Sequence, residues 1–308
     1  MNRMIGGTPP IILLPSANRQ DGDAAFESNQ AGQNMTTYSL PKEFSFSGKR
    51  VLVCGGGGSG IGSHVVDILS ELGAEIHVFD LQEPTADVAS YRSVDLSDPD
   101  AGMAAVEAIG QPFDVLINAQ GLFKEGLAVQ VVRTNFIGLR AVADKVLESM
   151  PAGGAVVSIA TQLPPLPSDL SEMRKFIDLP HSEAIEYCET HPEEIGDGYG
   201  FSKFRLAVWS LDAALANAKR GIRVNLVYPG RTDSPLLNNF IRDDGPMARQ
   251  RQASGHIELV SSVIGRIAHA REVAWPVVFL ASDAASYITG ARLPVEGGFL
   301  TAAELGRL

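Results

Sequence analysis

The residues of this sequence best suited to acid–base chemistry are a tyrosine and a lysine four positions apart, Tyr199 and Lys203. On a helix, side chains with this spacing lie on the same face. An ammonium group beside a phenol favours the phenolate, so Lys203 should lower the pKa of Tyr199 from its usual value of about 10. Such a pair could exchange a proton with a substrate hydroxyl near neutral pH. Taken alone, the pair is explained more simply as part of an ordinary amphipathic helix.

A second chemical feature is the glycine-dense stretch 55–62, which lies between an apolar run at 51–54 and an apolar-periodic segment. This order predicts a strand, a turn and a helix. A further apolar run at 76–79 ends on Asp80, which completes one βαβ unit. A helix that begins inside a glycine turn offers unpaired N–H groups and its positive dipole end to an anion. We therefore expect the turn to bind the diphosphate of a dinucleotide.

The glycines and the acid have distinct expected roles. Gly56, Gly60 and Gly62 should provide the turn, the close approach of the diphosphate and the contact of helix with strand. A carboxylate at Asp80 can accept both ribose hydroxyls of an adenosine, whereas a 2′-phosphate would meet like charge, so Asp80 favours NAD over NADP. A glycine-rich surface loop would explain the glycines alone. It does not account for the strand, helix and terminal acid around them.

The elements that position these residues follow from the rest of the pattern. Apolar and polar stretches alternate at the spacing of a repeated strand and helix, which predicts an α/β fold: a single doubly wound, parallel-sheet Rossmann domain. The predicted strands are 51–54, 76–80, 93–96, 114–118, 155–159, 223–228 and 292–295, and the predicted helices are 61–72, 101–109, 127–150, 199–219 and 272–280. In such a sheet, ligands bind at the carboxyl ends of the strands.

Three segments fall outside this rhythm. Residues 1–47 are rich in Gly, Pro, Ser, Asn and Gln and predict a flexible N-terminal arm, which leaves 48–308 as the catalytic domain. Residues 162–198 hold nine acids against two bases and predict an insertion that is partly helical. Residues 235–264 are rich in large apolar side chains and predict a cover over a bulky apolar substrate.

Composition excludes several classes of function. The chain has 308 residues and a net charge of −11, with no basic stripe, so we expect no nucleic-acid partner. Only Cys54 and Cys188 are present, which predicts a reducing compartment, the cytoplasm. No signal peptide or membrane span is evident. His181, Cys188 and His191 have no matching partner elsewhere, so we expect no metal.

Six motifs in order resemble those of the short-chain dehydrogenase/reductase family, over residues 49–300. They are the glycine pattern Gly56, Gly60 and Gly62; the turn Asn118, Ala119, Gln120 and Gly121; the helix residue Asn135; the pair Tyr199 and Lys203; Pro229 and Gly230 followed by Thr232; and Glu296, Gly297 and Gly298. The insertion and the segment PGRTDSPLL look most like the bacterial 3α-hydroxysteroid dehydrogenase and carbonyl reductase branch.

The resemblance implies a role for each site residue. Tyr199 would be the general acid and base, assisted by Lys203, by a substrate-binding hydroxyl at Thr161 and by Asn135 on a water-linked proton path. The implied cofactor contacts are Gly56, Ser59, Gly60, Ile61, Gly62, Asp80, Asp95, Leu96, Asn118, Gly121, Tyr199, Lys203, Pro229, Gly230 and Thr232, with Asp95 facing the adenine and Thr232 the nicotinamide amide.

Two positions depart from the family pattern. Thr161 stands where the family has a serine and adds a methyl group that stiffens the side chain. Ser158 is a poorer candidate because it faces the other side of the strand. Gln120 is larger than the family's usual alanine near the adenosine and would tighten or reshape that contact.

The resulting prediction is an NAD-dependent oxidoreductase that interconverts a secondary alcohol and a ketone on a bulky apolar, steroid-like or alicyclic substrate. A catalytically decayed NAD-binding sensor or interaction protein is the alternative. Epimerisation or dehydration would need a further acid and base, and no residues for them are evident. The insertion should obstruct pairing through the helix that begins at Tyr199. We therefore expect a homodimer built around the last strand and its helix.

Overall fold

The computed structural model describes residues 40–162, 165–242 and 263–307. Of the predicted arm, residues 1–39 lie outside the described residues. Residues 40–47 pack on the domain instead of extending from it: Phe46 is fully buried, and the ring of Phe44 lies 6.4 Å from that of Phe279. The described domain therefore begins before residue 48.

A seven-stranded parallel sheet forms the centre of the domain, with the strand order β3-β2-β1-β4-β5-β6-β7. The strands are β1 Arg50–Cys54, β2 Glu75–Asp80, β3 Ser90–Ser93, β4 Val115–Asn118, β5 Ala155–Ile159, β6 Arg223–Pro229 and β7 Arg292–Val295. The chain starts at the centre, winds outward to β3, returns to β4 and winds the other way. This confirms the predicted doubly wound fold, whose switch point lies between β1 and β4.

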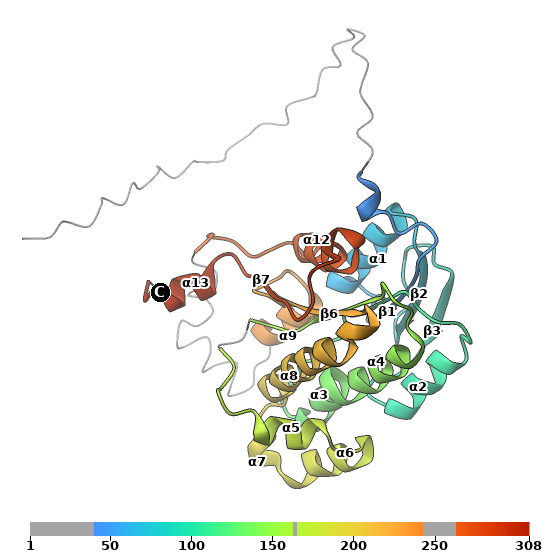
Figure 1. Cartoon of the computed structure of the whole chain (residues 1–308). Helices are drawn as coiled ribbons and strands as arrows, with labels where there is room; N and C mark the ends of the chain where they lie inside the picture. The colour runs from blue at the N-terminus through green and yellow to red at the C-terminus, as the bar shows by residue number, and fades with distance from the viewer. Residues whose placement is uncertain (1–39, 163–164, 243–262, 308) are drawn as a thin grey trace, which may run out of the picture. The chain divides into compact units, whose positions relative to one another are not determined.

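Helices cover both faces of the sheet, as Figure 1 shows. The helices are α1 Ile61–Glu71, α2 Pro99–Glu107, α3 Ala128–Val132, α4 Gly138–Ser149, α5 Ser171–Ile177, α6 His181–Thr190, α7 Pro192–Ile195, α8 Tyr199–Asn217, α9 Pro235–Arg242, α12 Ala270–Ala281 and α13 Phe299–Glu304, with short 3-10 turns at Lys42–Phe44, Ala218–Arg220 and Asp283–Ala285. Helices α1 and α12 lie on one face, and α2, α4 and α8 lie on the other.

Alternation along the strands builds two apolar cores. Val51 and Val53 of β1 point into the core under α1 and α12, whereas Leu52 and Cys54 point into the core under α2, α4 and α8. All four side chains are fully buried. A strand buried on both faces reads as a continuous apolar run, which is why this element is recognisable in the sequence.

Two predicted elements need correction. The third strand is Ser90–Ser93 and not 93–96, because its register pairs it with the end of β2 and no partner continues beyond Asp80. Val94 and Leu96 are nevertheless buried, in the loop that follows. The predicted helix 127–150 is interrupted by a π-helical turn over Arg133–Ile137, which apolar periodicity does not reveal.

The insertion forms the short helices α5, α6 and α7, which Figure 1 shows beside α3 and α8. Phe176 of α5 places its ring 4.9 Å from that of Phe201 on α8 and is nearly fully buried. The Arg174 guanidinium donates to both oxygens of Asp212 on α8, at 2.9 and 2.8 Å. The insertion therefore packs along the outer face of α8.

Arg140 of α4 connects the insertion to the domain through hydrogen bonds. Its guanidinium donates to the backbone carbonyls of Ile177 and Leu179, where α5 ends.

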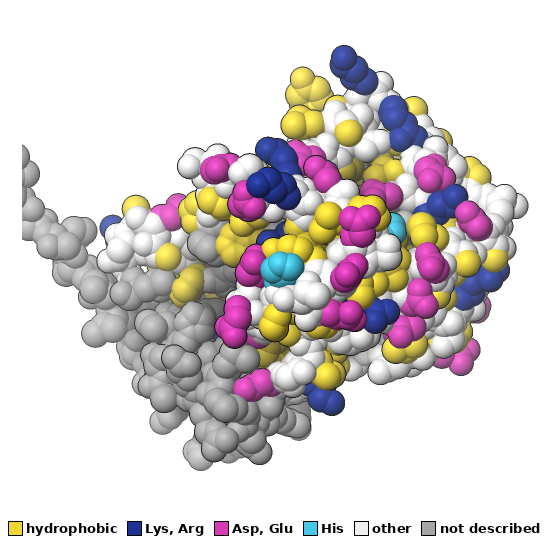
Figure 2. All heavy atoms as spheres, turned by 90° about the horizontal axis from the view of Figure 1, so that it is seen from below, with side chains coloured by type: hydrophobic (Ala, Val, Ile, Leu, Met, Phe, Trp, Pro, Cys, Tyr) yellow, Lys and Arg dark blue, Asp and Glu magenta, His cyan; other side chains and the backbone are white. Residues whose placement is uncertain are grey.

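From below, Figure 2 shows acidic side chains spread widely over the molecular surface, with apolar and basic ones between them. Within the described ranges, no helix has the length and apolar character needed to cross a membrane.

Candidate active site

A cavity of about 1600 Å³ opens at the carboxyl ends of the strands, and most of the predicted site residues line it. That volume exceeds the roughly 300–1,000 Å³ of ordinary ligand pockets. The predicted residues in its lining are Ser59, Gly60, Ile61, Gly62, Asp80, Asp95, Leu96, Gly121, Thr161, Tyr199, Lys203, Pro229, Gly230 and Thr232. The cavity thus joins the glycine turn and the tyrosine–lysine pair in one space.

Three predicted residues lie behind the cavity wall. A Cβ at Gly56 would lie 3.0 Å from the side chains of Val53 and Val66, so this glycine faces the core. Asn118 is fully buried, and its amide donates to the hydroxyl of Ser158 at 3.1 Å. Asn135 is also fully buried. They support the elements around the cavity, and their predicted roles toward a ligand stay predictions.

The glycine turn is shaped by close backbone contacts. The positive φ angles fall at Gly55 (84°) and Gly58 (67°), not at Gly56. A Cβ at Gly62 would lie 1.9 Å from the carbonyl oxygen of Gly55, so the start of α1 touches the end of β1. Gly60 has open space where its Cβ would be, with no atom within 4 Å. The turn therefore leaves its open face at Gly60.

The first turn of α1 is prepared for an anion. Gly60 is its N-cap, no side chain caps the helix, and the first turn carries no acid. Its leading N–H groups therefore lack a side-chain partner at the positive end of the helix dipole. The missing side chain of Gly60 lets a ligand come close to the backbone, and the helix dipole and the first N–H groups of α1 favour an anion. The site therefore fits a diphosphate.

Asp80 is held at the rim of this turn. One carboxylate oxygen accepts from the backbone N–H of Gly57 at 2.9 Å, and the other accepts from that of Gln82 at 3.0 Å. Each carboxylate oxygen has two lone pairs, so both retain capacity for a ribose hydroxyl. The acid is thus fixed in place without being saturated.

Asp95 and Thr232 make local hydrogen bonds at the cavity wall. Asp95 is exposed and accepts from the N–H and hydroxyl of Ser97, at 2.9 and 2.7 Å. Thr232 is buried and donates to the carbonyl of Gly230 at 3.1 Å. Gly230 itself leaves no room for a side chain, since a Cβ there would lie 2.8 Å from the Cα of Glu296.

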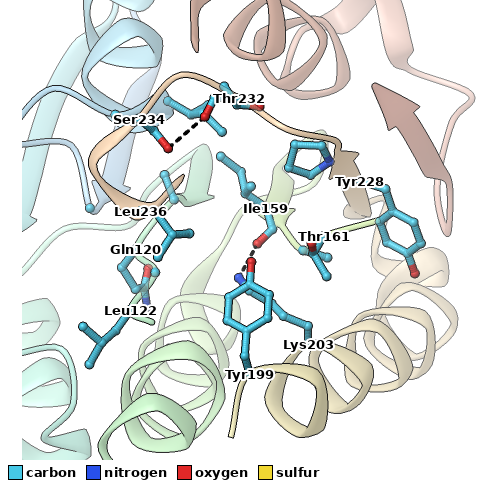
Figure 3. A pocket seen from close by; sticks show the side chains of 18 of the residues that line it. Gln120, Leu122, Ile159, Thr161, Tyr199, Lys203, Tyr228, Thr232, Ser234 and Leu236 are labelled. Atoms are coloured by element: carbon cyan, nitrogen blue, oxygen red, sulfur yellow. Dashed lines mark hydrogen bonds between the residues drawn. The ribbon is translucent and has the colours of Figure 1, made fainter. Parts of the chain in front are cut away.

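Tyr199, Thr161 and Lys203 converge on one side of the cavity (Figure 3). Thr161 lies two residues beyond β5, close enough to Tyr199 for its hydroxyl to lower the pKa of the phenol. The Lys203 ammonium donates to the carbonyl of Ile159 at 2.9 Å and lies 5.8 Å from the centre of the Tyr199 ring. Two hydroxyl groups and an ammonium group therefore line one side of the cavity.

Local backbone structure fixes Tyr199 at the first position of α8. Gly198, the N-cap, has a φ of 79°, and a Cβ there would lie 2.4 Å from the carbonyl oxygen of Ala128. The Asp197 carboxylate accepts from the backbone N–H of Tyr199 at 2.9 Å. The ring of Phe123 meets that of Tyr199 edge-on, with centroids 5.9 Å apart.

The electrostatics of the pair differ from the expectation. Burial raises the pKa of Tyr199 above its usual value, and the hydrogen bond from Thr161 offsets part of that rise. Burial also lowers the pKa of Lys203 to about 8. Burial outweighs the predicted lowering, so the Tyr199 pKa is raised, and the Lys203 ammonium donates to the Ile159 carbonyl.

Asn135 lies in the π-helical turn and clamps the backbone of Leu122. Its side-chain oxygen accepts from the Leu122 N–H at 2.7 Å, and its amide donates to the Leu122 carbonyl at 2.9 Å. Both polar ends of the side chain are therefore engaged in holding the turn 119–122. Its implied place on a proton path stays a prediction.

Several lining residues were not predicted from the sequence. Gly57 is one, since a Cβ there would lie 2.0 Å from the carbonyl oxygen of Gln82. Others come from the last third of the chain but lie outside the motifs found there: Leu211, Tyr228, Arg292, Phe299 and Leu300. Of the predicted cover 235–264, Leu236 and Leu237 line the cavity, and residues 243–262 lie outside the described residues.

Comparisons with known proteins support this assignment. A family model described as enoyl-(acyl carrier protein) reductase matches residues 188–300. The coniferyl-alcohol dehydrogenase of Pseudomonas sp. strain HR199 is 27% identical over 81% of this chain and 96% of its own length. The cis-4-hydroxycyclohexanecarboxylate dehydrogenase of Sinomonas cyclohexanicum is 28% identical over 82% of this chain and 96% of its own length.

Solved structures give the same picture. The 3-alpha-hydroxysteroid dehydrogenase of Pseudomonas sp. B-0831, solved as a complex with NADH, superimposes with a TM-score of 0.68. The match has 25% identity and covers 84% of this chain and 99% of that chain.

Proposed function

The chain belongs to the short-chain dehydrogenase/reductase family, and on that premise we propose that it interconverts a secondary alcohol and a ketone with a nicotinamide dinucleotide. The observation that carries the proposal is that Thr161, Tyr199 and Lys203 line the same cavity as the glycine turn, with the Thr161 hydroxyl close enough to Tyr199 to lower the pKa of the phenol. Two convergent hydroxyls can hold one substrate oxygen and exchange its proton.

The residues present fit the cofactor. Gly60 leaves open space at the start of α1, where the diphosphate would bind, and Asp80 retains acceptor capacity for the adenosine ribose. The negative charge of Asp80 would repel a 2′-phosphate, so we propose NAD as the preferred cofactor. When bound, the nicotinamide supplies or accepts the hydride.

The chain itself handles the proton. In alcohol oxidation, Tyr199 in its phenolate form would take the proton from the substrate hydroxyl, and Thr161 would hold the same oxygen in place. Lys203, whose pKa is lowered to about 8 by burial, sits beneath the ring and can stabilise the phenolate. In ketone reduction the same tyrosine would return the proton.

The cavity walls favour a bulky apolar substrate. Large apolar side chains line the cavity: Leu166, Leu211, Leu236, Leu237, Phe299 and Leu300. Two of the relatives are named for a cyclohexane and a steroid alcohol, which supports an alicyclic substrate. We propose a ring-bearing secondary alcohol or its ketone.

A catalytically decayed sensor on the same fold is less well supported. A decayed site would be expected to lose this arrangement, yet the Thr161 hydroxyl still lowers the pKa of Tyr199 and the Lys203 ammonium is held over the tyrosine ring. The threonine therefore keeps the hydroxyl where the family has a serine.

A panel of secondary alcohols tests the proposal. Purified protein is mixed with NAD and alicyclic, aromatic-ring and short open-chain alcohols, and the absorbance of NADH is followed. We expect turnover of at least one ring-bearing alcohol, with short open-chain alcohols poorer. NADH binding without turnover of any alcohol or corresponding ketone would instead favour the sensor.

A further inference from the structure

The side chain of Gln120 is buried in the cavity and has no hydrogen-bond partner in the described parts of the chain. Only 7% of the residue is exposed, and neither its amide nitrogen nor its carbonyl oxygen is bonded. A buried amide without hydrogen-bond partners destabilises the folded protein, because its lost hydration is not replaced. Such an arrangement persists in native structures when a ligand completes it.

Figure 3 shows the Gln120 side chain inside the cavity, beside Leu122 and Leu236. The turn that carries it is rigid, because Asn135 bonds both backbone polar groups of Leu122. The Ala119 N–H also donates to the carbonyl of Cys54 at 2.8 Å. The amide is thus presented from a fixed backbone and is ready to bind.

The surroundings identify the part of the ligand that it would meet. The Gln120 backbone abuts the first glycine of the turn, since a Cβ at Gly55 would lie 2.4 Å from the Gln120 nitrogen. On its other side, Leu122 precedes Phe123, whose ring contacts Tyr199. Gln120 therefore lies between the diphosphate turn and the tyrosine, where the ribose and diphosphate of a dinucleotide would pass.

The chemistry of a carboxamide fits that part of the dinucleotide. The amide nitrogen offers two N–H donors and the oxygen accepts. Diphosphate oxygens accept, and ribose hydroxyls both donate and accept, so either would satisfy the orphaned groups.

We propose that the Gln120 carboxamide hydrogen-bonds the ribose–diphosphate portion of the bound dinucleotide and contributes directly to cofactor affinity. The proposal rests on the proposed function, because it requires the cavity to bind a dinucleotide. Bound cofactor would then supply hydrogen-bond partners to the Gln120 amide.

Binding of NADH and of ADP-ribose to the apo protein tests the proposal, by fluorescence titration and calorimetry. ADP-ribose keeps the ribose and diphosphate but lacks the nicotinamide, so it isolates the assigned contact. Gln120→Leu, which has similar size and no polar group, should weaken both ligands about tenfold or more. Gln120→Glu should weaken them further, because a carboxylate would repel the diphosphate.

Thermal unfolding without ligand provides a second readout. Gln120→Leu should melt no lower than the wild type, since it removes an unsatisfied buried amide. Ser210→Ala is the matched control: its hydroxyl is also buried and lacks a partner among the described residues, but it lies outside the cavity. It should leave the affinity for both ligands unchanged. Gln120→Met gives the same test should Gln120→Leu not fold.

Each outcome decides between assignments. Unchanged affinity for NADH and ADP-ribose in Gln120→Leu would overturn the inference and leave the proposed function intact. Loss of NADH affinity with normal ADP-ribose affinity would move the contact to the nicotinamide, and a change confined to the alcohol KM would move it to the substrate; both contradict the proposal. A wild-type protein that binds neither NADH nor NADPH would refute the proposed function itself.

Discussion

The Lys203 ammonium donates to the carbonyl of Ile159 at 2.9 Å, although the whole insertion lies between these two residues in the sequence. The insertion therefore leaves and rejoins the domain at the reaction centre, and its helices pack along the outer face of α8. Because Tyr199 begins that helix, the packing of the insertion helps to hold the tyrosine in place.

The pH dependence of alcohol oxidation should depend on Thr161. Its hydroxyl lowers the pKa of Tyr199 and so offsets part of the rise caused by burial. Thr161→Ala removes that hydroxyl, so the Tyr199 pKa should rise and the phenolate should form only at higher pH. The rising limb of the kcat profile should move to higher pH, and kcat near pH 7 should fall about tenfold to a hundredfold.

Thr161→Ser provides the control for this experiment. It keeps the hydroxyl and loses only a methyl group, so the limb should stay in place and activity should be retained or raised. A limb that does not move in Thr161→Ala would show that the threonine leaves the tyrosine pKa unaffected.

Cofactor preference should follow the charge of Asp80. We expect the wild type to bind NADH much more tightly than NADPH, and Asp80→Asn to narrow that gap by removing the repulsion of a 2′-phosphate. Asparagine keeps one side-chain oxygen, which can still accept a hydrogen bond from one of the two backbone N–H groups that donate to Asp80. Glu83→Gln, an exposed acid on the same loop, is the control and should change nothing. Similar wild-type affinities for the two cofactors would refute the assignment.

Alanine substitutions at two glycines of the turn should affect different properties, cofactor affinity at Gly60 and folding stability at Gly62. Gly60→Ala meets no atom within 4 Å, so thermal stability without ligand should be normal, while NADH affinity should fall because the methyl group obstructs the diphosphate. Gly62→Ala would collide with the Gly55 carbonyl oxygen at 1.9 Å, so stability should fall by roughly 1–3 kcal/mol. Normal NADH affinity in Gly60→Ala would place the diphosphate elsewhere.

Assembly should avoid the face that the insertion covers. We propose a dimer built around β7 and α12, with α8 excluded from subunit pairing. Trp275→Glu on α12, where the indole is 40% exposed, should dissociate the dimer, whereas Leu215→Glu on α8, 79% exposed, should not. Light scattering measures both masses. A tetramer, or a dimer dissociated by Leu215→Glu, would contradict this prediction.

The sheet was predictable because its strands are buried on both faces and stand out as apolar runs. The same logic misplaced the third strand: Val94 and Leu96 are apolar because they are buried in a loop at the cavity edge, not because they pair. Burial in a loop and pairing in a strand can both produce the same short pattern of apolar residues in a sequence. The structure distinguishes the two cases, because the pairing of β2 with β3 ends at Asp80 and Ser93, before Val94 and Leu96.

The site was predictable in composition but not in its finer geometry. Spacing alone brought Tyr199 and Lys203 together, yet the direction of the lysine depends on the Ile159 carbonyl, which no side-chain pattern encodes. Likewise, the asparagine at 135 stood out, but its clamp on Leu122 requires a π-helical turn. Backbone partners of this kind become visible only in three dimensions.

The most direct test of the account compares the wild type with Tyr199→Phe, using an alcohol that the wild type oxidises with NAD. The substitution removes one oxygen and little volume, so NADH binding and thermal unfolding should match the wild type, while kcat should fall at least a hundredfold. That combination is the predicted result. Turnover of Tyr199→Phe at the wild-type rate, with intact NADH binding, would contradict the central claim that this tyrosine moves the proton.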